Sequence, residues 1–385
     1  MNELGSLVQQ TADRLAGQQV GVVVAGLAGG AVEIRGAGRT HAAPGGGVPD
    51  AHTLFEIGSV TKVFTSLALA RLVLAGSVSL DEPLADVLAD ALADALPPGA
   101  TVPAKRGTPI TLQHLATHSS GLPRLPAGML LPALLTPNKP DPYRRCTSAA
   151  LLAGLARTRL HSEPGRGFRY SNLGAGLLGL ALAHRAGTGY EELITREICE
   201  PLGLADTVIT VDGERSARLA QGHTSGRRAV PGWNLADLAG AGGLRSTAAD
   251  LAILLRAQLA SADDAPLAPA IALTREVEHR VNPFAWMHLG WLAHRLHAQQ
   301  GGHLQIWHNG ETGGFRSLVA FDPEKQVGVI VLANTRRSVD PAGVALLRTL
   351  QNGGGAGVGT AGGAGDGTPD GTGRDGRKGR PSERG

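Results

Sequence analysis

Short β-prone runs near both ends of the chain place the strongest constraint on its fold. Residues 20–27 and 31–34 flank Gly29-Gly30, a pattern that predicts a hairpin. Residues 315–321 and 327–333 predict two further strands, joined by a polar turn at 322–325. Hairpins from the two chain ends can share one sheet. We therefore expect an antiparallel sheet built from both ends of the chain.

Apolar residues at helical spacing predict helices in several other parts of the chain. The expected helices cover residues 4–15, 59–75, 110–116, 147–160, 173–186, 190–199, 248–259 and 341–350. A further hairpin is expected from residues 287–297 and 303–307, with Gly301-Gly302 at its turn. The segment 308–310 is expected to precede the next strand.

Length and composition favour a globular protein with a large core. The chain has 385 residues, of which 42% are hydrophobic, enough for one large domain or two. Its formal net charge is only +3 and its basic residues are scattered, so nucleic-acid binding is not indicated. Cys146 and Cys199 form neither a disulfide framework nor a metal-ligand set, and we expect buried thiols.

The first residues show neither a basic segment nor an uninterrupted apolar run of the kind that signal peptides have. We therefore expect a cytoplasmic protein with no membrane association. At the other end, residues 352–385 are rich in glycine and poor in apolar side chains, which predicts a disordered tail. Residues 123–145 contain many prolines and predict a long loop that shapes access to a cleft.

Ser59 and Lys62 are the first candidates for a reactive site. They form an S-x-x-K pattern at the start of an apolar helix, where residues three apart lie on the same face. A lysine with a lowered pKa can accept the proton of a serine hydroxyl and make it nucleophilic. The alternative is that Ser59 caps the helix and Lys62 is solvated, which is the more common meaning of an isolated S-x-x-K.

Other polar elements offer partners for Ser59. Tyr170 and Asn172 form a Y-x-N element before a helix, and His308 begins a His-Asn-Gly element near a strand. The segment 117–123 can be explained by turn chemistry alone. The histidines between 279 and 308 invite a metal-site hypothesis, but no acidic or cysteine ligands stand at zinc spacing, and we expect no metal.

Taken in order, these motifs resemble the serine β-lactamase and penicillin-binding protein superfamily, in particular its class C β-lactamase, DD-peptidase and family VIII esterase branch. The resemblance spans about residues 20–335. It rests on the segments 55–62, 118–123, 164–172, 201–204, 242–247, 308–315 and 332–334.

The resemblance implies an α/β (α+β) fold of the β-lactamase/transpeptidase type. One domain would cover residues 1–351, with a mostly helical subdomain at about 60–205 inserted into a subdomain that contains an antiparallel sheet flanked by helices. No cofactor is implied. The expected partner is a small-molecule or peptide substrate, and the oligomeric state is open.

The resemblance also assigns roles to single residues. Ser59 becomes the acylated nucleophile, Lys62 its proton acceptor and Tyr170 a shared acid and base near the leaving group. Asn172 would hold the amide of the substrate. The oxyanion would be bound by the backbone N–H groups of Ser59 and Glu311.

The third motif departs from the lysine-led form, because His308 stands where lysine would, followed by Asn309, Gly310 and Glu311. An unperturbed histidine titrates near pH ~6.5, so we expect His308 to lose its charge within the working range. The carboxylate of Glu311 can also disfavour anions or point to solvent. We therefore expect neutral esters or peptides to be better substrates than penicillins.

These expectations define a serine hydrolase that works through an acyl-enzyme on an ester, an amide or a D-amino-acid peptide. An acyltransferase or cyclase would use the same residues, and a penicillin-binding-like module without turnover would keep the fold. An α/β-hydrolase is set aside because the sequence contains no G-x-S-x-G.

Overall fold

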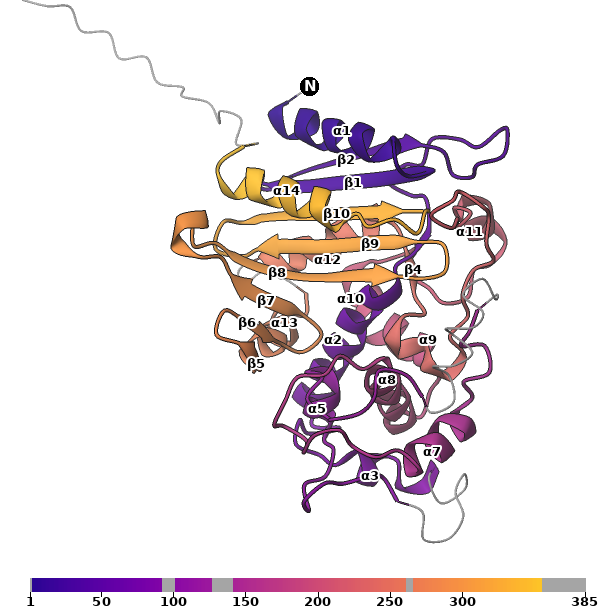
Figure 1. Ribbon diagram of the computed structural model, residues 1–385, viewed down its shortest axis with the longest axis vertical. Coiled ribbons are helices and arrows are strands. Elements are labelled where there is room, and N and C mark those ends of the chain that lie inside the picture. The colour runs from indigo at the N-terminus through magenta and orange to yellow at the C-terminus, as the bar shows by residue number, and fades with distance from the viewer. Residues whose placement is uncertain (1, 92–100, 127–140, 261–265, 355–385) are drawn as a thin grey trace, which may run out of the picture.

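One large antiparallel sheet with packed helices brings the first strands of the chain beside its last strands (Figure 1). The computed structural model describes residues 2–91, 101–126, 141–260 and 266–354. The eight-stranded sheet has the order β2-β1-β10-β9-β8-β7-β6-β5. Its strands are β1 (Gly21–Ala28), β2 (Ala31–Gly38), β5 (His279–Asn282), β6 (Ala285–Met287), β7 (Leu292–Arg295), β8 (Leu304–Glu311), β9 (Arg316–Asp322) and β10 (Val327–Ala333). The expected sheet built from both chain ends is confirmed, since β1 pairs with β10.

Side chains that alternate along the central strands face two different layers. Val22 and Val24 of β1 pack with α1 and α14, whereas Val23 and Ala25 pack into the core on the other face, which includes α12. This alternation follows from the two-residue period of a strand. The helices described in the structure are α1 (Glu3–Ala16), α2 (Thr61–Leu74), α3 (Leu84–Val87), α5 (Leu112–Ala116), α7 (Ser148–Ala156), α8 (Asn172–Ala186), α9 (Tyr190–Ile194), α10 (Glu200–Leu202), α11 (Gly213–Arg218), α12 (Ala248–Leu259), α13 (Ala268–Glu276) and α14 (Asp340–Gln351).

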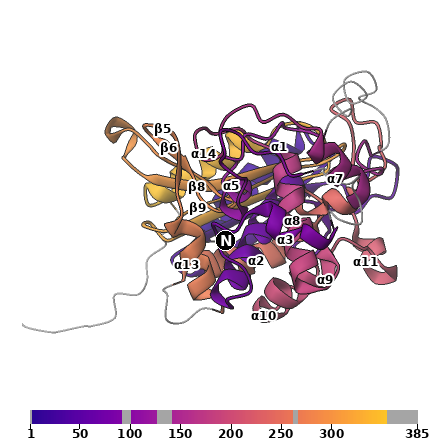
Figure 2. The same ribbon diagram turned by 90° about the horizontal axis from the view of Figure 1, so that it is seen from below.

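Between the short strands β3 (Phe55–Glu56) and β4 (Arg245–Ser246), which pair with each other, all the described elements are helical. This stretch contains the range in which an inserted helical subdomain is expected. Figure 2 shows α2, α8 and α9 grouped together beside the sheet. Helix α2 is buried on nearly all sides, because it packs against α8, α9 and α13.

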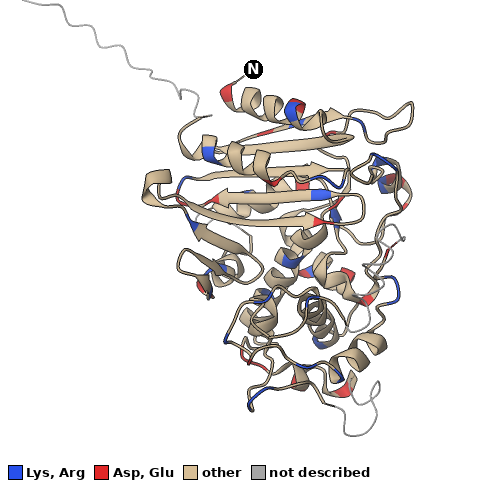
Figure 3. Cartoon of the chain, in the orientation of Figure 1, with Lys and Arg blue, Asp and Glu red and all other residues tan. Residues whose placement is uncertain are grey.

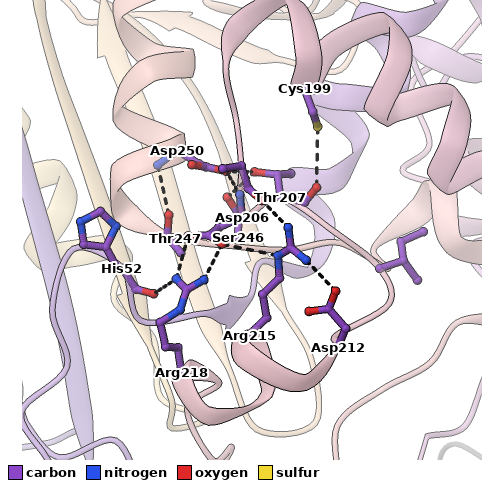
Figure 4. Close-up of polar contacts among 12 residues, drawn as sticks. His52, Cys199, Asp206, Thr207, Asp212, Arg215, Arg218, Ser246, Thr247 and Asp250 are labelled. Carbon is purple, nitrogen blue, oxygen red and sulfur yellow. Dashed lines mark hydrogen bonds and ion pairs between the residues drawn. The ribbon is translucent and has the colours of Figure 1, made fainter.

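A polar network fixes the chain around β4 (Figure 4). The carboxylate of Asp250 accepts hydrogen bonds from the backbone N–H of Asp206 at 2.9 Å and from the hydroxyl of Thr207 at 2.8 Å. Asp206 in turn receives two hydrogen bonds from Arg218, at 2.7 and 2.6 Å. Arg218 also donates to the backbone carbonyl of His52 at 2.9 Å. The network therefore ties the segment before β3 to α11 and α12.

Several sequence-based expectations need correction at their boundaries. The predicted hairpin at 287–307 is confirmed as β7 and β8, but its first strand starts at Leu292, because Gly290 has a φ of +75° that interrupts the extended chain. His308, Asn309 and Gly310 precede β9 as expected, but they lie inside β8 and not between strands, since β8 pairs with β9 as far as Glu311. The expected tail and most of the proline-rich loop fall on residues 355–385 and 127–140, outside the described residues.

The state of the two cysteines agrees with the sequence. The thiols of Cys146 and Cys199 are buried. Figure 3 shows Lys and Arg interspersed with Asp and Glu over many elements. In the described ranges, no helix is both long and apolar enough to cross a membrane, and no three His, Cys, Asp or Glu side chains gather as metal ligands would.

Candidate active site

Ser59 lies in a tight turn that joins β3 to α2. The turn is the 3₁₀ element η1 (Gly58–Val60), so α2 begins two residues later than expected, at Thr61. Gly58 has a φ of +50°, and a Cβ atom added there would lie 2.7 Å from the backbone nitrogen of Glu311. Only glycine permits both the backbone conformation and this close approach of β8. The turn therefore places Ser59 directly beside the end of β8.

Lys62 contacts Ser59 from the first turn of α2. Its Nζ atom lies 3.0 Å from the Ser59 Oγ atom and donates to the backbone carbonyl of Ala241 at 2.5 Å. The side chain is 2% exposed. Burial, and then the charge of Arg124, hold the pKa of Lys62 well below its usual value. An amine with a lowered pKa is unprotonated over a wider range of pH than a solvated lysine, and in that form it can accept a proton. The alternative of a solvated Lys62 is therefore wrong.

Tyr170 lies immediately before α8 and covers the amine of Lys62. The Nζ atom of Lys62 is 5.0 Å from the centroid of the Tyr170 ring. Burial raises the pKa of Tyr170 to about 12, although hydrogen bonding to Ser59 opposes the shift. Ser171 caps α8 by accepting a hydrogen bond from the backbone N–H of Gly174, and this fixes the start of the helix behind Tyr170.

His308 faces Tyr170 from β8, with the two ring centroids 6.2 Å apart. The side chain is fully buried, and its Nδ1 atom lies 2.7 Å from the backbone carbonyl oxygen of Asn309. Burial, and then the neighbouring Lys62, lower the pKa of His308 to about 3. The expectation that His308 changes charge within the working range is therefore wrong, because the buried imidazole is already neutral there.

His118 is part of the same cluster, although the sequence explained its segment by turn chemistry alone. Its ring centroid is 4.3 Å from that of Tyr170, and its φ of +55° is rare for a residue with a side chain. The Nδ1 atom accepts a hydrogen bond from the backbone N–H of Ser171 at 3.3 Å. Burial, followed by the charge of Lys62, keeps the pKa of His118 well below 6.5. Only the resemblance of segment 118–123 signalled this residue.

The predicted substrate-binding residues take different positions. Asn172 is the first residue of α8, and its Oδ1 atom is buried without a hydrogen-bond partner among the described residues. Asn309 turns away, because its side-chain amide donates to Asp340 at 2.8 Å. Gly310 packs so tightly that an added Cβ would lie 2.0 Å from the carbonyl oxygen of Ile57. The structure thus brings Asn172, Gly310 and Glu311 to the site but not the side chain of Asn309.

A cavity of about 200 Å³ opens above Ser59. Two aromatic side chains on its wall, Tyr143 and Trp233, pack edge to face with centroids 5.3 Å apart. They were missed by sequence reasoning, although Tyr143 falls within the proline-rich segment expected to shape access. The cavity is lined by Ser59, Arg124, Leu125, Tyr143, Asn172, Trp233, Leu235, Leu238, Ala241, Gly242, Glu311, Thr312 and Arg336.

This arrangement contains the parts that acyl transfer requires. The serine hydroxyl lines the cavity, a buried amine with a lowered pKa lies within hydrogen-bond distance of it, and a tyrosine hydroxyl is hydrogen-bonded to it. Together with the antiparallel sheet and its helices, these features define the class of penicillin-recognising serine enzymes.

Comparison with known proteins identifies the family. The profile of the family described as Beta-lactamase matches residues 7–352, and the chain belongs to this family. D-alanyl-D-alanine-carboxypeptidase/endopeptidase AmpH of Escherichia coli is 31% identical over 75% of this chain and 73% of its own length. A human protein, putative beta-lactamase-like 1, is 31% identical over 78% of this chain and 58% of its own length.

The fold has a close counterpart among solved structures. A mutant class C beta-lactamase superposes with a TM-score of 0.73 and 21% identity, covering 91% of this chain and 98% of the other. This match confirms the β-lactamase-type fold. The family's homologues are serine hydrolases, and membership of the family supports a serine hydrolase-like function for this protein.

Proposed function

We propose that this protein is a serine hydrolase that forms an acyl-enzyme at Ser59 and cleaves an ester, an amide or a D-amino-acid peptide. The observation that carries the proposal is the 3.0 Å contact between the Lys62 amine and the Ser59 hydroxyl at a buried position. It supports the assignment because a neutral amine at this distance can take the hydroxyl proton as the oxygen attacks.

The proposed reaction has two halves. In the first, Ser59 Oγ attacks the carbonyl carbon of the substrate while its proton moves to Lys62. The backbone N–H groups of Ser59 and Glu311 stabilise the oxyanion, and their proximity is supported by the packing of Gly58 on Glu311. Tyr170 relays a proton to the departing alcohol or amine. In the second half, water attacks the ester at Ser59 and releases the acid.

Peptides that end in D-amino acids are the first substrates to test. One relative with 31% identity carries the name of a D-alanyl-D-alanine carboxypeptidase and endopeptidase. In the proposal, the side chain of Asn172 binds the amide of the acyl group, because its Oδ1 atom is a buried acceptor without a partner among the described residues and it lines the cavity.

The test is intact-mass detection of covalent adducts on a panel of esters, D-amino-acid peptides, β-lactams and a fluorophosphonate probe. We expect one adduct per chain, with modification at Ser59 and none in Ser59→Ala. Ser77→Ala is a matched control, because Ser77 is exposed in the loop after α2. Labelling that persists at another serine in Ser59→Ala would sink the assignment.

The same experiment separates the alternatives. A module without turnover would hold its adduct indefinitely, whereas a hydrolase regains its original mass as water releases the acid. An acyltransferase would release the acyl group faster when an alcohol or amine acceptor is added, and the transferred product would be seen by mass. We expect release by water alone.

A further inference from the structure

The carboxylate of Glu311 at the cavity mouth is paired with two cations. Its Oε1 atom lies 2.8 Å from the Nε atom of Arg336, and its Oε2 atom lies 3.0 Å from a terminal nitrogen of Arg316. The three side chains together carry one net positive charge. Glu311 therefore does not present an isolated negative charge to a substrate, which removes one reason to expect that it disfavours anions.

Arg124 is a second source of positive charge in the cavity lining. Its guanidinium carbon is 5.4 Å from the centroid of the Tyr170 ring, and the residue is exposed. No acidic side chain forms an ion pair with Arg124 within the described ranges. The neighbouring segment 127–140, which falls outside them, contains no Asp or Glu in the sequence. Among the described residues, Arg124 is therefore a cation without an ion-pair partner.

The backbone holds Arg124 beside the reacting groups. Its carbonyl oxygen accepts hydrogen bonds from the backbone N–H groups of Asn172 at 2.9 Å and Leu173 at 3.3 Å. The residue is thus fixed to the first turn of α8, which also positions Tyr170. Within the described residues its guanidinium contacts the Tyr170 ring and no acidic partner, so its donors can meet a ligand. Arginine presents these donors in a planar fork that matches a carboxylate.

The groups beneath Arg124 do not supply a competing charge. Burial holds the pKa values of Lys62, His118 and His308 below their usual ranges, so these side chains tend toward their neutral forms. Glu56, the buried carboxylate before the Ser59 turn, is paired with Arg245 at 3.4 Å. The cations that an anionic substrate meets in this cavity are therefore the exposed arginines Arg124 and Arg336.

We propose that Arg124 is a specificity-determining residue that binds a carboxylate of the substrate, so that the enzyme prefers anionic acyl donors to neutral ones. This inference rests on the proposed function, and it reverses the preference expected from the sequence. The carboxylate is a group apart from the scissile carbonyl, and Tyr143 and Trp233 offer apolar surface to the chain that connects the two.

The test uses matched pairs of ester substrates that differ only in a carboxylate or its uncharged primary amide. One pair carries this group on the acyl portion and the other on the alcohol. The readout is the ratio of kcat/KM for the anionic substrate to that for the neutral one. Effects of a variant on the shared chemistry cancel in this ratio, including any change that the loss of Arg124 causes at Lys62.

We expect wild type to prefer the anion, and Arg124→Gln to lower the ratio about tenfold or more in at least one pair, as the loss of a hydrogen-bonded ion pair would. Arg124→Lys should retain part of the preference. Arg106→Gln removes the same charge from a side chain that is 79% exposed and paired with Glu163, and it should leave the ratio unchanged. Added salt should reduce the ratio in wild type and not in Arg124→Gln.

The outcomes distinguish a failure of this inference from a failure of the proposed function on which it rests. If neutral esters acylate Ser59 but Arg124→Gln leaves the ratio of both pairs unchanged, the role of Arg124 is overturned while the hydrolase stands. The same holds if Arg106→Gln lowers the ratio as much as Arg124→Gln does. If no ester of either charge acylates Ser59 in wild type, the proposed function fails first, as the intact-mass experiment would show independently.

Discussion

The side chains at the cavity form two different regions, a buried floor and a charged rim. We define the floor as the side chains of Ser59, Lys62, His118, Tyr170 and His308. We define the rim as the side chains of Arg124, Glu311 and Arg336. Lys62, His118 and His308 are at most 2% exposed, whereas the rim residues all reach solvent. Burial shifts the pKa values of Lys62, His118, Tyr170 and His308 in the direction that favours their neutral forms, whereas the rim consists of arginine and glutamate side chains at the surface.

This difference assigns separate tasks to the two regions. Burial makes a charged group costly, so an amine such as that of Lys62 becomes a usable base only where water is excluded. Exposed charges attract a ligand at little cost to stability, because water already screens them. In the proposed enzyme the floor therefore carries out the chemistry, and the rim selects the substrate.

The largest expected effect comes from removing the amine on the floor. Lys62→Met replaces a buried lysine by an apolar side chain of similar length, and we expect kcat/KM for ester substrates to fall by about 10²–10⁴-fold, the usual contribution of a general base. The comparison with Arg124→Gln is direct, because the rim variant should still hydrolyse neutral esters. A Lys62→Met enzyme with normal turnover would contradict the division of tasks.

The same variant should also be more stable than wild type. The pKa of Lys62 is lower in the folded than in the unfolded chain, so between these two values the unfolded state binds the extra proton and stability rises with pH. Lys62→Met lacks this penalty. Its melting temperature should exceed that of wild type by roughly 2–4 °C per kcal/mol relieved. The difference should shrink as the pH approaches 10.5.

The second largest effect should come from the contact between the Ser59 turn and β8. In Gly310→Ala the new Cβ would lie 2.0 Å from the Ile57 carbonyl oxygen and 2.3 Å from the Ser317 Oγ atom. We expect the two segments to separate, with a loss of about 1–3 kcal/mol in unfolding free energy and about 10²-fold in kcat/KM. Urea unfolding and ester hydrolysis measure both.

Gly154→Ala provides the control for this substitution. Gly154 lies inside α7, and among the described residues no atom within 4 Å would meet an added Cβ. Alanine is the better helix former, so this variant should be neutral or slightly stabilising. If Gly310→Ala were equally harmless, the floor would not depend on the close approach of β8.

Local patterns were sufficient to predict much of the fold and two residues of the floor. β-prone runs bounded by turns predicted β1, β2, β9 and β10, and helical spacing predicted most helices, because these elements bury apolar side chains against their neighbours. Ser59 and Lys62 were found from their spacing, since residues three positions apart in a helix lie on the same face. Tyr170 was found only through the order of motifs in a resembled family.

The rim could not be predicted in the same way. Arg124 and Tyr143 belong to a proline-rich segment without periodicity, so nothing in the sequence places them in the cavity. The pairing of Glu311 with Arg336 joins residues on either side of β9 and β10, and only the tertiary structure brings them together. The charge state of His308 depended likewise on burial, which a motif does not state.

A small effect is expected on the rim itself. Arg336→Gln removes one of the two cations on Glu311 and leaves Arg316 in place at 3.0 Å. Exposed ion pairs of this kind contribute about 0–1 kcal/mol, so the melting temperature should barely move. The preference for anions should fall by less than in Arg124→Gln. A larger fall would move the anion-binding role from Arg124 to Arg336.

The smallest expected effect is that of pH on substrate preference. We expect the ratio of kcat/KM between an anionic and a neutral ester to stay constant from about pH 5.5 to 9. His308 is neutral throughout this range, because burial lowers its pKa to about 3, and arginine does not deprotonate there. The rates themselves should still change with pH as Lys62 gains or loses its proton.

The pH dependence of the rates can be separated from that of the ratio, because in the proposed mechanism only the enzyme form with neutral Lys62 reacts with either substrate. Its ionisation therefore cancels in the ratio, while an ionisation that alters affinity for the anion alone does not. A step in the ratio near the ordinary histidine pKa of 6.5 would show that His308 titrates in the working range. The floor would then contribute to selection, and the separation between neutral floor and charged rim would fail at this residue.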